Sequence, residues 1–493
     1  MNNIIVLPLI IPIFTAIILV FLRNQVVLQR IISLLTMIAV SIISFLLLEL
    51  VQREGILKID FSGWEVPYGI LFVADSFSSL MVLTASVVST LCILYAFSTI
   101  GKEYEEMFFY PFVLLLIGGV NGSFLTGDIF NLFVCFEVML MASYVLVALG
   151  GKRVQLRESL KYVLINVVAS WFFLVALAFL YGTVKTLNMA HIAERITEVG
   201  QDPMITTVAF VFLIVFSLKA GLLLFFWLPG SYVAPPTAVQ ALFAALLTKV
   251  GIYALIRTFT LMFPHKPEIT HTVIGILAAL TIIAGCMGAI SSRNVLTISA
   301  YNIIISVGFV LIGLAVGTET AISGSVLYLV HDIVAKALLF LLVGMMVFLT
   351  GEKLIDHMSG LIRNYPLFGW IYFICMLALM GVPPLSGFVG KVLIGQGAIE
   401  AESYFLLFIG FASSIAVMYS LLKIFLASFF GETIITIEDK KPIPFVSMTS
   451  FILLTMCVIG IGIFAEYLLV YVEDAAETLM NPSIYIDAIL NEN

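Results

Sequence analysis

Long apolar runs separated by short polar segments dominate this chain. Fourteen runs come close to or exceed the roughly 20 apolar residues that cross a bilayer as a helix, and they are apolar on every face rather than along one stripe. The two-residue alternation of strands is absent from them. The pattern predicts an all-α, polytopic membrane protein. The expected spans are 3–22, 30–50, 72–98, 108–126, 129–149, 160–183, 205–227, 236–260, 271–290, 294–315, 320–350, 366–398, 403–430 and 445–470.

Composition supports this interpretation. Of 493 residues, 62% are hydrophobic and 11% charged, with a mean hydropathy of +1.17, whereas soluble domains are about 45–50% apolar and 25% charged. The net charge of −7 gives no indication of nucleic-acid binding. The five cysteines are isolated in apolar segments without ligand or disulfide spacing, so we expect no metal and no cofactor. The first apolar run lacks a basic n-region and a cleavage site, and we expect it to be a retained helix.

Basic residues are distributed unequally between the two sets of loops. The odd-numbered loops carry twelve Lys and Arg residues, and the even-numbered loops carry six, with Arg257 counted among these six. The densest cluster runs from Lys152 to Lys161 in the fifth loop. Because cytoplasmic loops are enriched in positive charge, the pattern predicts that the odd-numbered loops are cytoplasmic and that both termini lie outside.

Two expected spans are interrupted. The seventh, 205–227, breaks near Gly221, and the twelfth, 366–398, is too long for one straight crossing and is broken around Pro383 and Pro384. These two spans occupy corresponding places in two consecutive sets of five helices, spans 4–8 and 9–13. Consecutive units of five helices must be inverted relative to each other. Interrupted helices at matching places in inverted repeats are typical of a transport site.

The expected division of the chain follows from these repeats. It comprises 1–107 with the first three spans, 108–262 as the first five-helix repeat, 271–430 as the second, and 431–493 as the last span with an acidic tail. We expect the tail after residue 470 to form a short interfacial helix or to be partly disordered.

Five lysines fall inside apolar spans, where an ionised side chain costs a few kcal/mol or more. Lys219 and Lys249 lie about thirty residues apart on either side of the first interruption, which indicates a route for charge. Lys336 is the third. Lys391 follows the Pro-Pro interruption, where unwound backbone is tolerated only against protein or water. Lys423 lies near a helix end, where its amine can reach the membrane edge, so we treat it as a secondary candidate.

Acidic residues and a histidine accompany these lysines. Glu137 lies in the middle of the fifth span, where a carboxylate is either functional or held by a structural hydrogen bond. Asp332, also a secondary candidate, and Lys336 are four residues apart and can pair on one helix face. His331 and Lys336 are about 140° apart around a regular helix and share a path only if the helix is distorted. Asp75, at the start of the third span, is interpreted as a boundary or structural residue.

These motifs resemble the antiporter-like subunits shared by respiratory complex I and the Mrp-type cation/proton antiporters. The matches extend over most of residues 72–430. They are Glu137, Lys219 with Trp227-Leu228-Pro229, the Ala234-Pro235-Pro236 turn, Lys249 before Gly251, His331 with Lys336, and GVPPLSGFVGK ending at Lys391. The chain looks most like the D-subunit branch of the Mrp-type family. It lacks the Pro and His that many complex I relatives carry after the first lysine.

The resemblance implies a role for each residue. Glu137 and Lys219 would form the ionisable pair of a first half-channel, Lys249 and His331 a connecting relay, and Lys336 and Lys391 a second half-channel. It further implies a transporter, not an enzyme, that conducts protons in exchange for Na⁺ export in a bacterial plasma membrane. The implied partners are other subunits of a membrane antiporter complex, protons, Na⁺ and the lipid bilayer.

Two alternatives remain open at this point. One is a proton-pumping membrane subunit of a complex I-like redox complex, which would differ in its redox partners. The other is a non-conducting scaffold subunit, in which the buried ionisable residues could be neutralised without loss of transport.

Overall fold

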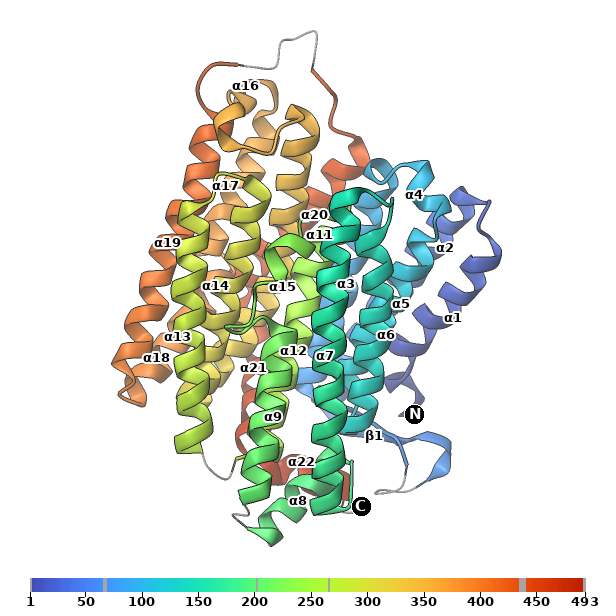
Figure 1. Cartoon of the computed structure of the whole chain (residues 1–493), viewed down its shortest axis with the longest axis vertical. Helices are drawn as coiled ribbons and strands as arrows, with labels where there is room; N and C mark the ends of the chain where they lie inside the picture. The colour runs from blue at the N-terminus through green and yellow to red at the C-terminus, as the bar shows by residue number, and fades with distance from the viewer. Residues whose placement is uncertain (1, 65–68, 201–202, 265–266, 434–439, 491–493) are drawn as a thin grey trace.

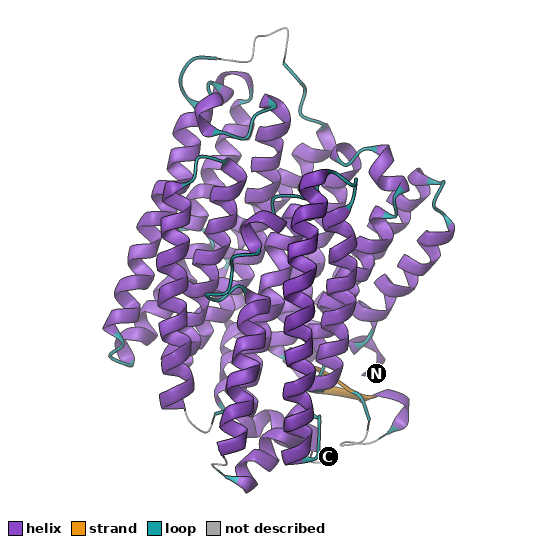
Figure 2. Cartoon of the chain, in the orientation of Figure 1, coloured by secondary structure: helices purple, strands orange, loops and turns teal. Residues whose placement is uncertain are grey.

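A computed structural model describes residues 2–64, 69–200, 203–264, 267–433 and 440–490 as a bundle of long helices (Figures 1 and 2). The helices of the N-terminal part and first half are α1 (Leu7–Phe21), α2 (Val26–Glu54), α3 (Ser76–Thr99), α4 (Lys102–Glu106), α5 (Phe109–Leu125), α6 (Ile129–Ala148), α7 (Arg153–Val184), α8 (Met189–Val199), α9 (Pro203–Ala220), α10 (Leu228–Ser231), α11 (Thr237–Leu242) and α12 (Thr248–Arg257). Those of the second half are α13 (Pro267–Ser291), α14 (Val295–Val316), α15 (Glu319–Thr350), α16 (Leu361–Asn364), α17 (Pro366–Met380), α18 (Gly387–Glu400), α19 (Tyr404–Phe429), α20 (Phe445–Ile463), α21 (Ala465–Met480) and α22 (Pro482–Leu490).

Short elements complete the fold. Strands β1 (Leu57–Asp60) and β2 (Leu71–Ala74) pair antiparallel between α2 and α3, an addition that the span pattern did not predict. Three short 3₁₀ turns are Asn2–Ile5, Phe61–Gly63 and Ile355–His357. Two π-helical turns, η3 (Phe243–Leu247) and η4 (Thr258–Met262), lie within one continuous helix from Thr237 to Met262.

The helices are those of a multi-pass membrane protein. Within the described ranges, eleven continuous helices are long and apolar enough to cross a bilayer, and α1, α5 and α17 are shorter apolar helices. The helix Thr237–Met262 is buried along its whole apolar length, and α14 and α15 are buried along most of theirs. These three helices, which are apolar on most of their surface, therefore form the centre of the bundle (Figure 1).

The two expected helix breaks are confirmed. α9 ends at Ala220 and α17 at Met380, and each is followed by a glycine with positive φ, 78° at Gly221 and 84° at Gly381. Glycine adopts this left-handed conformation without the steric penalty of a Cβ atom. Both helices consequently stop inside the bundle, and Figure 1 shows the chain leaving α9 at mid-height.

The C-terminal tail differs from the expectation of an interfacial or partly disordered segment. α21 packs along α3 and α15 and buries Val472, Ala475, Ala476 and Leu479. The Ser76 hydroxyl donates to the Asp474 carboxylate, and α22 packs against α8. The acidic residues of α21 interrupt its apolar run in sequence, but every third or fourth residue is apolar and faces the bundle. Both termini lie at the same end of the molecule (Figure 1).

Candidate functional site

Glu137 and Lys219 are joined by a serine. Lys219 is buried one residue before the end of α9, and its Nζ donates to Ser170 Oγ over 3.0 Å and to the Asn166 carbonyl over 3.5 Å. The Ser170 hydroxyl in turn donates to Glu137, which is partly exposed on α6. The Lys219 amine also lies 5.7 Å from the centre of the Phe136 ring. Ser170 was not predicted as a site residue, although polar residues recur every four positions along α7.

Lys249 lies on α12 in the centre of the bundle. Its Nζ donates to the Ala244 carbonyl over 2.7 Å, and Ala244 belongs to the π-helical turn η3. Such turns interrupt the regular hydrogen-bond ladder and recur at functional sites. Gly251 permits a close helix contact here, because a Cβ atom at this position would lie 2.6 Å from the Ala220 backbone nitrogen. The end of α9, which carries Lys219, therefore packs directly on α12, which carries Lys249.

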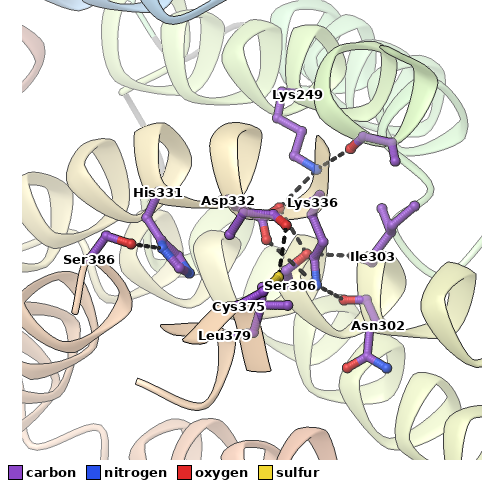
Figure 3. A network of polar contacts seen from close by, with 12 residues as sticks. Lys249, Asn302, Ile303, Ser306, His331, Asp332, Lys336, Cys375, Leu379 and Ser386 are labelled. Carbon is purple, nitrogen blue, oxygen red and sulfur yellow. Dashed lines mark hydrogen bonds and ion pairs between the residues drawn. The ribbon is translucent and has the colours of Figure 1, made fainter. Parts of the chain in front are cut away.

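Asp332 connects Lys249 with Lys336 (Figure 3). The Lys249 Nζ lies 2.8 Å from Asp332 Oδ2, and the Lys336 Nζ lies 3.7 Å from Asp332 Oδ1, as the four-residue spacing predicts. Ser306 Oγ donates to Oδ2 over 3.0 Å, and the Lys336 Nζ donates to the Asn302 carbonyl over 2.9 Å. All three charged side chains are buried. The contact between Lys249 and Asp332 joins helices distant in sequence, and no local pattern indicates it.

His331 faces a different side of α15. Its Nδ1 lies 2.7 Å from Ser386 Oγ in the break after α17, and its ring lies 5.1 Å from the Tyr328 ring. Because α15 is a regular α-helix throughout, His331 and Lys336 do not share one face of it. The structure thus brings His331 to the interrupted segment and Lys336 to Asp332.

Lys391 lies in the first turns of α18, just after the interruption. Its Nζ donates to the Leu379 and Met380 carbonyls at the end of α17, over 3.2 and 2.9 Å, and to Ser414 Oγ over 2.9 Å. Lys391 and Lys336 both line a small cavity of about 10 Å³, together with Asn302, Ser306, Tyr328 and Ser413. That volume holds about one water molecule.

Lys423 lies apart from these residues. Its Nζ donates to the Ile290 and Ser292 carbonyls over 3.3 and 3.0 Å, at the C-terminal end of α13. A lysine at this position satisfies free carbonyls and stabilises the negative end of the helix dipole.

Arg257 is not a loop residue, and its assignment to the even-numbered loops was wrong. It is buried in α12, where its Nη2 lies 2.5 Å from Asp75 Oδ2. Its guanidinium packs over the rings of Phe77, Tyr253 and Tyr485. Asp75 also caps α3 through the Ser78 backbone N–H. In sequence, a charged residue near the end of a span cannot be told from a loop residue. The Asp75–Arg257 pair therefore becomes evident only from the packing of α3, α12 and α22.

Comparison with known proteins identifies the class. Residues 126–416 match the family described as NADH:quinone oxidoreductase/Mrp antiporter, TM. The chain therefore belongs to this family of membrane subunits, which confirms the resemblance seen in the motifs. It is 44% identical to the D subunit of the Na⁺/H⁺ antiporter of Bacillus subtilis and 43% identical to that of Alkalihalophilus pseudofirmus, with all of both chains covered in each case.

Solved structures agree with this assignment. The chain superposes on one chain of the Mrp complex from Dietzia sp. with a TM-score of 0.94 at 26% identity, covering 99% of both chains. It superposes on a chain of respiratory complex I from Thermus thermophilus with a TM-score of 0.84 at 24% identity, covering 97% of this chain and 100% of the other. The second likeness shows a shared fold.

Proposed function

We propose that this chain is the proton-conducting subunit of a multi-subunit Na⁺/H⁺ antiporter. In this proposal protons move along Glu137, Lys219, Lys249, His331, Lys336 and Lys391 in exchange for Na⁺ export. The observation that carries the proposal is the buried Lys249–Asp332–Lys336 cluster, which links the two halves of the chain. The names of the full-length relatives support antiport as the activity, and transport rather than an enzymatic reaction.

The charges of the central cluster suggest how a proton crosses between the halves. Asp332 can neutralise one lysinium, and a second buried cation would lack a partner at a cost of several kcal/mol. Protonation of one of the two lysines therefore favours deprotonation of the other through their mutual repulsion. Asp332 stays ionised during this exchange and acts as a fixed counter-charge. The cavity between Lys336 and Lys391 can hold the water that continues the path.

The same proposal includes two inverted five-helix repeats within 108–262 and 271–430. α7 and α15 have the same length of 32 residues, and Tyr162, Asn166 and Ser170 in α7 occupy the positions of Tyr328, Asp332 and Lys336 in α15. The residues before α6 and α14 also form matching isolated bridges, Asp128 with Asn188 and Asn294 with Leu354. These regularities support the repeat, with α9 and the α17–α18 pair as its two interrupted helices.

The proposed topology has fourteen crossings, with residues 1–107 and 431–493 flanking the repeats. The eleven long helices and three shorter apolar helices support this count. We place the protein in a bacterial plasma membrane with the odd-numbered loops in the cytoplasm and both termini outside. The burial of Arg257 removes one charge from the even-numbered loops and so strengthens the asymmetry.

The proposed partners are the other subunits of a membrane antiporter complex, with protons, Na⁺ and lipid. The close superposition on a chain of the Mrp complex from Dietzia sp. supports a multi-subunit assembly. A proton-pumping subunit of a complex I-like redox complex is the second candidate, because the fold is shared with respiratory complex I. Full-length identity above 40% to antiporter D subunits favours the first candidate.

The proposal is tested by replacing Asp332→Asn in the assembled complex. Without the Asp332 carboxylate, a protonated Lys249 or Lys336 would be a buried charge without a counter-ion, at a high free-energy cost. We therefore expect Na⁺-induced ΔpH in everted vesicles to disappear. The matched control is Asp356→Asn, an exposed aspartate that pairs with Arg293. Normal exchange by Asp332→Asn would contradict conduction through this cluster and favour the scaffold alternative, provided that the other subunits co-purify in normal amounts.

A further inference from the structure

A cavity of about 610 Å³ lies at the end of the bundle that carries the odd-numbered loops. It reaches from the loops before α7 and α14 to the chain between α9 and α11. Its lining residues include Lys152, Arg157, Glu158, Gly230, Gln240 and Lys353. The cavity is therefore an opening, wide enough for water, from one aqueous face to the segment that follows the interrupted helix α9.

Glu158 is a buried carboxylate in the wall of this cavity. Only 5% of the residue is exposed, although its partners Arg157 and Lys161 are exposed and lie 2.8 and 3.2 Å from its Oε1. Gly230 packs directly against the carboxylate, because a Cβ atom at this position would collide with Glu158 Oε2 unless the carboxylate moved. Carboxylates are seldom fully buried unless paired, and this one faces water-accessible space on one side and the protein interior on the other.

Glu158 begins a polar stripe on α7. Glu158, Tyr162, Asn166 and Ser170 follow each other at four-residue intervals and so share one face of the helix, about 6 Å apart along its axis. The Asn166 amide donates to the Tyr162 carbonyl over 2.9 Å, and the Tyr162 hydroxyl lies 3.0 Å from Ser143 Oγ. Ser170 ends the stripe at the junction with Lys219. The stripe thus runs from the cavity to the first ionisable pair.

Three buried polar atoms beside this stripe have no hydrogen-bond partner among the described residues. They are the Tyr144 hydroxyl, the Tyr232 hydroxyl and the Trp227 Nε1–H. The Tyr144 and Trp227 rings lie 5.4 and 5.3 Å from the Tyr162 ring, and the Tyr232 ring lies 5.8 Å from that of Trp227. Because buried polar groups in proteins are nearly always partnered, by water if not by protein, these atoms mark sites for water between the cavity and Asn166.

We propose that Glu158 and the α7 stripe form the passage by which protons move between the Lys219–Glu137 pair and the water on the odd-loop side. This inference rests on the proposed function. It adds that the first ionisable pair is connected to the side of the odd-numbered loops and that the ion using this connection is the proton. Tyr162, Asn166 and Ser170 are buried beyond this cavity, and a proton can pass along hydrogen-bonded side chains and water there, whereas Na⁺ would have to move as a hydrated ion. Glu158 is the group that exchanges protons with the water of the cavity.

The first test replaces Glu158→Gln in the whole antiporter complex. We expect the initial rate of Na⁺-induced ΔpH to fall by about tenfold or more, because a positioned proton-transfer group is lost. Glu158→Asp keeps a titratable group and should recover most of the rate. The matched control is Glu103→Gln, an exposed glutamate on α4 at the same end of the bundle, which should behave as the unmodified protein. A loss that Asp does not recover would indicate a structural anchor and overturn the proposal.

The second test measures water access along the stripe. In a background with Cys286 and Cys457 replaced, we expect Ser143→Cys to react with a small hydrophilic thiol reagent from the odd-loop side, and this reaction to block transport. Cys92, fully buried in α3, serves as the internal control and should stay unmodified. An unreactive Ser143→Cys together with full activity of Glu158→Gln overturns the proposed passage. If Lys219→Ala abolishes transport in the same preparation, the proposed function still stands, whereas normal transport by Lys219→Ala contradicts both.

Discussion

Lys249 and Asp332 belong to different halves of the chain, and their Nζ and Oδ2 atoms lie 2.8 Å apart with both side chains buried. The same carboxylate lies 3.7 Å from the amine of Lys336. Two lysines that compete for one carboxylate cannot titrate independently, so the proton on one depends on the state of the other. We therefore propose that Asp332 couples the two halves of the chain.

The Glu137–Ser170–Lys219 bridge gives the first prediction. Glu137→Ala and Lys219→Ala should each abolish Na⁺-induced ΔpH, because each removes a titratable group. Ser170→Ala keeps both groups but removes the hydroxyl between them, and we expect a slower rate rather than a complete loss. All three complexes should assemble, as judged by co-purifying subunits. Equal rates for Ser170→Ala and the unmodified protein would mean that water replaces the hydroxyl.

Lys391 gives the second prediction, on the need for a titratable group. Its amine donates to two carbonyls and a serine, contacts that an arginine can partly reproduce. Arginine keeps the charge but does not release its proton. Lys391→Arg should therefore assemble yet transport poorly, and Lys391→Ala should also fail. Full activity of the arginine variant would make Lys391 a fixed charge rather than a proton carrier.

The third prediction concerns orientation in the membrane. Arg153 and Glu194 are exposed and lie at opposite ends of the bundle, at the start of α7 and in α8. With the odd-numbered loops in the cytoplasm, an impermeant thiol reagent added to intact cells should label Glu194→Cys and not Arg153→Cys. Labelling should reverse in everted vesicles. The opposite pattern would invert the assigned topology without affecting the fold.

The Asp75–Arg257 pair gives the fourth prediction, which concerns stability. Removing one partner of a buried ion pair leaves an uncompensated charge and costs about 3–5 kcal/mol. Arg257→Met should therefore lower the yield and the thermal stability of the assembled complex. The double variant Asp75→Asn with Arg257→Met removes both charges and should recover much of the loss. If the double variant is no more stable than Arg257→Met, the pair is not the source of the effect.

The class of fold and most residues of the candidate axis could be predicted from sequence. Apolar runs are local features, and each must form a helix in a bilayer because no water satisfies its backbone. Gly221 and Gly381 likewise set the two helix ends through their own conformational freedom. A lysine inside an apolar span can likewise be recognised from sequence. The free-energy cost of its charge depends on its depth in the membrane more than on any particular neighbour.

Which charges meet depends on tertiary packing alone. The contact of Lys249 with Asp332, the bridging position of Ser170 and the burial of Arg257 against Asp75 all require particular rotations and packing of helices far apart in sequence. The side of α15 that carries His331 was settled in the same way, by its contact with Ser386. The cavity beside Glu158 is formed by several segments that the chain brings together only on folding, so its existence follows from packing geometry rather than from any local pattern.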